Sequence, residues 1–156
     1  MGWAAWTRPM LKALARFVLL LSGACVLAFT ACSTPAETPT ASIEGTVWSL
    51  VEVGGATVPV EEGVKHPDLT LELETKRVTG FAGVNTYGGT YKLEGAALSF
   101  GPLMMTRMAG PAPQMRLEQA FVAALAETTH WTITAERLVL LGANDRVLVQ
   151  FEAVEP

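Results

Sequence analysis

Cysteine is scarce in this sequence, and both copies, Cys25 and Cys32, lie near the N-terminus. A domain formed by the rest of the chain has no disulfide and depends on its apolar core. Basic residues are also few: three of the eleven precede Cys32, which leaves eight against fifteen acidic residues, a net charge of −7. Binding of phosphates needs a basic footprint, so we expect no nucleic-acid partner.

Histidine is equally rare, with His66 and His130 as the only two. Neither stands in an H-E-x-x-H or Cys/His zinc spacing, and the sequence has no G-x-S-x-G, phosphate-binding loop or C-x-x-C. We expect His66 in an exposed loop and His130 at the start of a strand. The sequence therefore predicts no catalytic residue, no cofactor and no enzymatic activity.

A long apolar run is missing too, because residues 17–31 amount to 15 residues where a spanning helix needs about 20. This run follows a basic stretch, from Arg8 to Arg16, as in a secretory signal. It ends in Phe29-Thr30-Ala31-Cys32, which resembles the lipobox of bacterial lipoproteins, although Phe29 stands where Leu is usual. The resemblance implies cleavage before Cys32 and lipid attachment to it. Residues 22–25 are a poorer candidate, and an uncleaved N-terminal anchor is the alternative.

These features divide the chain into a signal peptide (1–31), a lipidated cysteine with a flexible tether (32–44) and a folded domain (45–156). Met10 is an alternative start that gives a more ordinary signal. Ser33 is not Asp, which in lipoproteins of two-membrane bacteria implies the outer membrane, facing the periplasm. The expected partners are the membrane, through the lipid anchor, and an unknown envelope protein, and the sequence leaves the oligomeric state open.

From Thr46 onward the apolar residues mostly recur with period two, which predicts antiparallel strands with one buried face. The clearest alternations are Leu69, Leu71 and Leu73, then Tyr91 and Leu93, then Val147, Val149 and Phe151. Short turn segments separate the strand-like runs and are expected to be hairpin connections. They are residues 94–97, 134–137 and 142–145.

One segment changes period: Leu117, Phe121 and Leu125 recur every four residues, whereas Arg116, Glu118, Gln119 and Glu127 fall elsewhere. This predicts an amphipathic helix that begins near Pro113. Several strands and one helix predict an α+β domain, a curved antiparallel sheet, open and barrel-like, packed around that helix.

Residues 80–91, GFAGVNTYGGTY, resemble the motif of the META domain, the HslJ-like family of small bacterial envelope proteins. Further matches follow in order over about residues 45–153. These are Trp48, Leu50, Thr106 to Ala109, Glu118, Phe121, Leu125, Trp131, Leu138 and Leu140. The resemblance implies an association with heat shock and stress, whereas no biochemical activity is defined for the family.

The motif residues Gly80, Gly83, Asn85, Tyr87, Gly89, Tyr91, Thr106 and Met108 are interpreted as mainly structural. Glycines in strands permit bulges and close approach, and strand aromatics usually pack. A binding site formed by the motif is the alternative. Many family members carry cysteines where this chain has Val84 and Gly110, so a redox role of such a pair is excluded here.

Two ligand hypotheses stay open beside a protein-interaction role. A curved sheet closed by a helix can leave a lipocalin-like pocket for a small apolar ligand, lined by Leu117, Phe121 and Leu125. The same residues would also fill a core. Four methionines, Met104, Met105, Met108 and Met115, fall within twelve residues. Their thioethers suit Cu(I), although methionine is also a common filler of packing gaps.

Overall fold

The structure, a computed structural model, describes residues 41–61 and 63–154. The predicted signal peptide and Cys32 lie outside the described residues. The elements follow one another as β1 (Val47–Val53), β2 (Ala56–Thr57), β3 (Asp68–Glu72), β4 (Arg77–Phe81), β5 (Thr86–Glu94), β6 (Ala97–Phe100), β7 (Met104–Met105), α1 (Ala112–Glu127), β8 (His130–Thr134), β9 (Arg137–Leu141), η1 (Ala143–Asp145) and β10 (Val147–Ala153). Among the described residues, no helix is both long and apolar enough to cross a bilayer.

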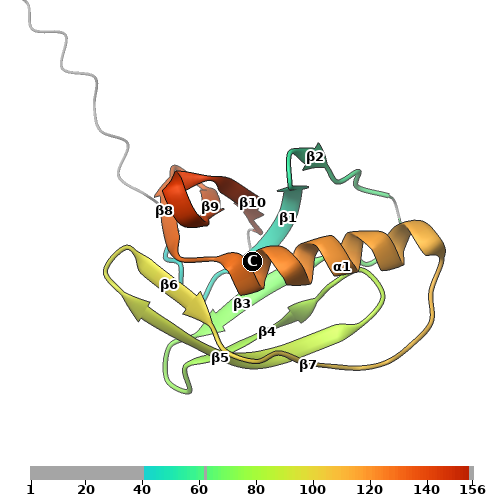
Figure 1. The fold of residues 1–156 in the computed structure, drawn as a ribbon, viewed down its shortest axis with the longest axis horizontal. Coiled ribbons are helices and arrows are strands. Elements are labelled where there is room, and N and C mark those ends of the chain that lie inside the picture. Colours follow the sequence, from blue (N-terminus) through green and yellow to red (C-terminus); the bar gives the residue numbers. More distant parts are fainter. Residues whose placement is uncertain (1–40, 62, 155–156) are drawn as a thin grey trace, which may run out of the picture. The chain divides into compact units, whose positions relative to one another are not determined.

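The strands form a ring in which every described pairing is antiparallel (Figure 1). Neighbours run β1-β3-β4-β5-β6-β8-β9-β10, and β10 returns to β1 with Trp48 opposite Ala153. The seam between β6 and β8 is narrow, because a single pair, Ala97 and His130, joins these strands. The sheet is therefore ring-like but not an even barrel.

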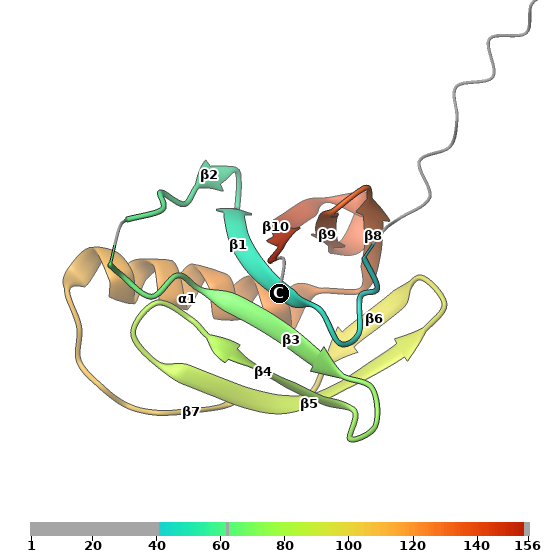
Figure 2. The ribbon, with the colours of Figure 1, turned by 180° about the vertical axis from the view of Figure 1, so that it is seen from behind.

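Helix α1 crosses the ring and packs against β1, β6 and β10. Figure 2 shows β3, β4 and β5 in front of it. Phe121 is fully buried and lies edge-to-face between two aromatic rings, 5.8 Å from Tyr87 and 5.9 Å from Phe151 between centroids. Such contacts add to the burial of the rings themselves. The helix thereby joins β5 to the last strand.

The ends of α1 have local causes. Pro113 occupies the first turn, where the missing N–H costs no helical hydrogen bond. At the other end, the hydroxyl of Thr128 donates to the carbonyl of Ala124 over 2.9 Å and its backbone turns extended. The sequence prediction of one helix beginning near Pro113 is confirmed.

The predicted fold class, an α+β domain with a curved antiparallel sheet around one helix, is confirmed. The core contains Trp48, Leu50, Leu69, Phe121, Leu138 and Phe151, all fully buried. Two details of the predicted alternation are wrong. Leu73 follows the end of β3 and is 58% exposed, and Leu148 is buried because a bulge between Val147 and Val149 shifts the register of β10.

The domain begins earlier than the sequence pattern indicates. Residues 41–44 were assigned to the tether, yet Ile43 is buried and its carbonyl accepts a hydrogen bond from the Trp48 indole over 3.1 Å. Next to it, the Gly45 N–H donates to the carbonyl of Leu71. The chain is therefore fixed to the sheet from about Ala41 onward.

Candidate functional site

A cavity of about 230 Å³ lies between the start of α1, the end of β1 and the segment 56–67. Its walls are mainly apolar. They are formed by Val53, Ala56, Thr57, Val58, Pro59, Glu61, Val64, Lys65, His66, Pro67, Gly83, Pro113, Gln114 and Leu117. A concave apolar site with few polar groups is the usual form of a small-molecule site.

The cavity has few polar groups, and only some of them have hydrogen-bond or ionic partners within the protein. His66 is half-buried, with Nε2 2.5 Å from the carbonyl of Leu50, so this nitrogen is held as the donor. Lys65 lies over the ring of Phe81 and 3.8 Å from Asp68. In contrast, Oε1 of Gln114 is buried and accepts no hydrogen bond within the described residues. The expectation of an exposed His66 is wrong, because the residue turns toward β1.

Leu117 belongs to the cavity wall, whereas Phe121 and Leu125 are fully buried in the core. The three residues share one face of α1, but only the end of that face nearest Pro113 reaches the cavity. The cavity therefore lies at one end of the ring, beside its filled interior.

A second polar cluster joins Asn85 to Glu118 of α1. One carboxylate oxygen of Glu118 accepts the backbone N–H of Asn85 over 2.7 Å and that of Val84 over 3.2 Å, and the other accepts the Asn85 amide over 2.9 Å. Both side chains are buried, 3% and 7% exposed. Glu118 was assigned to the polar side of the helix, and this is wrong: it lies three residues before Phe121, on the inward face.

Asn85 also fixes the segment that follows β7. Its side-chain oxygen accepts the Met108 N–H over 2.7 Å and the Thr106 hydroxyl over 2.8 Å, while its amide donates to the Met108 carbonyl over 3.2 Å. Loss of any of these partners would leave buried polar groups unpaired. Asn85, Thr106, Met108 and Glu118 thus form one network that ties three segments together.

The glycines of the motif lie where backbones meet. A Cβ on Gly80 would stand 2.2 Å from the carbonyl oxygen of Asp68, and one on Gly89 would stand 2.8 Å from Leu103. Gly83 has a φ of +125°, beside the start of α1. Any side chain at Gly80 or Gly89 would therefore separate neighbouring segments.

The two motif tyrosines share the inner face of β5 and are both buried. The Tyr87 hydroxyl donates to the carbonyl of Asp68 over 3.0 Å. Burial, and then the charge of Asp68, raise the pKa of Tyr87 well above its usual value. This phenol therefore stays protonated at physiological pH.

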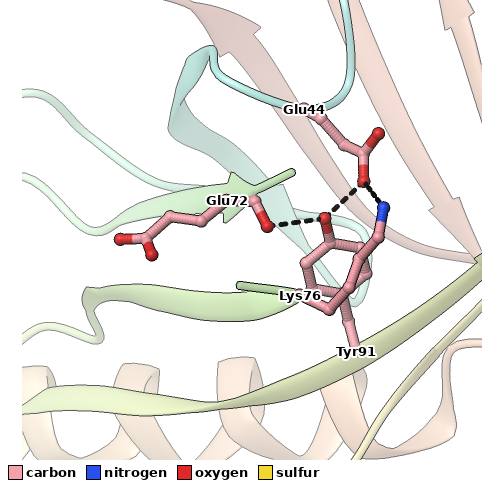
Figure 3. A network of polar contacts seen from close by, with 4 residues as sticks. All are labelled: Glu44, Glu72, Lys76 and Tyr91. Carbon is pink, nitrogen blue, oxygen red and sulfur yellow. Dashed lines mark hydrogen bonds and ion pairs between the residues drawn. The ribbon is translucent and has the colours of Figure 1, made fainter. Parts of the chain in front are cut away.

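Tyr91 belongs to a polar network with Glu44, Glu72 and Lys76 (Figure 3). Its hydroxyl donates to the carboxylate of Glu44 and lies 3.0 Å from the Glu72 carbonyl, and Lys76 pairs with Glu44 over 2.8 Å. The hydrogen bond from Lys76, and after it the one from Tyr91, lowers the pKa of Glu44. Burial, and then the hydrogen bond to Glu44, raises the pKa of Tyr91. We call Glu44, Lys76 and Tyr91 the entry cluster.

The four methionines border a shallow hollow between α1 and residues 103–109, together with Asn85 and Glu118. Met104 and Met108 are 77% and 57% exposed, and Met105 and Met115 are half-buried. The structure thus gathers all of them around one feature. Within the described residues, no group of three or more His, Cys, Asp or Glu side chains is placed to hold a metal ion.

His130 is exposed, at the start of β8.

The fold and the cavity define a small domain with one helix inside a ring of antiparallel strands and an apolar cavity at one end. The META domain model matches residues 41–155, so the chain belongs to the META domain family. A comparison with curated proteins gives no match.

Solved structures share this fold. A protein from Burkholderia xenovorans, solved by NMR, is 30% identical with a TM-score of 0.58, over 73% of this chain and 85% of that one. A second NMR structure is 23% identical with a TM-score of 0.57, over 72% and 94% of the two chains. A DUF4847 family protein from Bacteroides vulgatus, 15% identical with a TM-score of 0.52, covers 70% of this chain and 93% of its own.

Proposed function

We propose that this chain is an exported, lipid-anchored protein of the bacterial envelope that acts by binding rather than by catalysis. The proposed anchor is Cys32, preceded by a signal-like run and followed by Ser33, which favours the outer membrane. Membership of the META domain family is compatible with this placement. A role in stress is part of the proposal through the family resemblance alone.

The observation that carries the binding function is the cavity of about 230 Å³ beside α1. Its apolar wall favours a small apolar ligand, as in the carrier hypothesis. The unpartnered Oε1 of Gln114 adds a preference. The residue lines the cavity, so rotation of its amide would present this oxygen to a ligand with an N–H or O–H group. The Nε2 atom of His66 is already bonded to the Leu50 carbonyl and is not available to a ligand.

Indole and benzothiophene test this proposal, because they match in size and shape but only indole has an N–H donor. We expect both to bind the full-length protein in calorimetry, with indole binding more tightly. Gln114→Leu should remove the preference for indole and leave benzothiophene binding in place. Equal binding of the two compounds to the parent protein would refute a role for Gln114.

A cavity-filling variant locates the site. Leu117→Trp places a larger side chain in the wall and should abolish binding of both compounds. Gln119→Trp is the matched control, since this residue is exposed on the same helix and lies outside the cavity. Failure of both compounds to bind the parent protein would contradict the carrier function and leave binding of an envelope protein as the proposed activity.

A further inference from the structure

The methionine hollow is independent of the cavity and has its own geometry. Its thioethers come from three places: Met104 and Met105 from β7, Met108 from the loop that follows, and Met115 from the first half of α1. Every methionine in the described part of the chain borders this hollow. Thioether side chains from a strand, a loop and a helix thus line one hollow of the surface.

The strand pleat separates the two methionines of β7. Met105 pairs with Tyr87, whose buried ring contacts Phe121 of α1, so the side chain of Met105 lies on the helix side of the sheet. Met104 pairs with Gly88 and has its side chain on the opposite face, where it is 77% exposed. Met105 therefore lies on the same side of the sheet as Met115 of α1, and Met108 lies in the loop that connects β7 to α1.

The supporting network fixes the backbone of Met108 relative to α1, which contains Met115. Both backbone polar groups of Met108 are bonded to the side chain of Asn85. Asn85 is bonded in turn to Glu118, which lies one turn beyond Met115 on α1. A loop backbone that is already held in place loses less entropy when a metal binds.

We propose that Met105, Met108 and Met115 bind one Cu(I) ion. Thioether sulfur is a soft, neutral donor that selects Cu(I) over the hard divalent metals, and it needs no deprotonation. Met108 supports this function further, because more than half of its side chain is exposed, beyond what filling a packing gap requires. Arg107 also borders the hollow but is exposed, so its charge lies in water.

Anaerobic titration of the full-length protein with Cys25→Ser and Cys32→Ser, which removes the two thiols that would also bind Cu(I), against the Cu(I)–bicinchoninate complex tests this site. The parent protein should withdraw one equivalent of Cu(I). Met108→Leu and Met115→Leu should each weaken binding by at least about tenfold, because each removes one of three sulfur ligands. Leucine conserves volume, so the fold is expected to persist, and circular dichroism checks it.

Met104→Leu is the matched control and should leave the affinity for Cu(I) unchanged. X-ray absorption of the loaded parent should show sulfur as the only ligand type. A parent protein that takes no Cu(I) from bicinchoninate would overturn the proposal. So would a Met104→Leu variant as weak as Met108→Leu, or a folded triple variant of Met105, Met108 and Met115 that still binds.

Discussion

Val84 and Gly110 face each other across the start of β5 and the loop before α1: a Cβ on Gly110 would lie 2.6 Å from one methyl carbon of Val84 and 3.3 Å from its Cβ. The Val84 side chain occupies the space that Gly110 leaves open. By the family resemblance, these are the two positions at which many members carry cysteine.

The contact predicts a clash in Gly110→Ala. The added methyl group meets both methyl groups of Val84, and overpacking of this kind costs about 1–3 kcal/mol. Urea denaturation should show this loss, and Val84→Ala in the same chain should recover most of it. Independent, additive losses in the double variant would contradict the contact.

Cysteines at both positions should form a disulfide. The separation of 3.3 Å is slightly below the usual Cβ–Cβ range of about 3.5–4.5 Å, so a small shift brings the pair into place. The closed loop predicts a stabilisation on the order of 3 kcal/mol. After oxidation, the denatured double variant should contain no more free thiols than the parent. Two additional reactive thiols would show that the positions do not meet.

The pair formed by Asn85 and Glu118 predicts a large effect of Glu118→Gln. Glutamine has an NH2 group in place of one carboxylate oxygen. The Asn85 backbone N–H and the Asn85 side-chain amide both donate to Glu118, so one of these donors would face another donor and stay unpaired. We expect a loss of about 1–3 kcal/mol in the free energy of unfolding. Faster hydrogen exchange at the Val84 and Asn85 amides should accompany it. Gln119→Ala is the control, because Gln119 is the exposed neighbour of Glu118, and it should change stability little. Equal stability of the two variants would refute this role of Glu118.

Glu44 predicts a pH dependence at the entry cluster. Its pKa is lowered from the ordinary 4.5 in the folded protein, first by the bond from Lys76 and then by that from Tyr91. The folded state therefore binds the proton less well than the unfolded state, and the stabilisation is present above pH 4.5 and disappears as the pH falls through the folded pKa.

Unfolding experiments from neutral pH down to about pH 3 measure this effect. Glu44→Gln should be less stable than the parent at neutral pH, and the difference should shrink toward the acid end. Glu152→Gln is the control, since it removes an exposed ion pair with Arg137, which contributes little. A constant difference between Glu44→Gln and the parent at every pH would refute a charge effect.

Local patterns explain how much of the fold was predictable. The hairpins at 94–97 and 134–137 and the helix follow from turn residues and from apolar spacing, both of which act over a few residues. Closure of the ring depends on β1 pairing with β10, about a hundred residues apart, which no local pattern specifies. The bulge that buries Leu148 lies within the hairpin of β9 and β10, but it shifts the register of β10 by one residue, which a period-two pattern does not show.

The site was predictable only in part, for the same reason. Leu117 was marked by helical spacing. The cavity also needs Gln114 of α1, and His66, which reaches it through the path of the segment 56–67. The inward position of Glu118 could have been predicted from its spacing of three residues from Phe121 and seven from Leu125, which places it on the apolar face of the helix despite its charge. The grouping of the methionines was visible in the sequence, whereas the strand pleat that separates Met104 from Met105 needed the pairing of β7.

Native mass spectrometry of the full-length protein, purified from its own membrane, tests both the lipid anchor and the bound ligand. We expect the mass of residues 32–156 plus acyl groups on Cys32, with an apolar small molecule that is lost on denaturation. A chain that keeps residues 1–31 or carries no acyl group would contradict the lipid anchor. A correctly acylated chain without any adduct, whose Leu117→Trp variant behaves as the parent does toward indole, would contradict the carrier function.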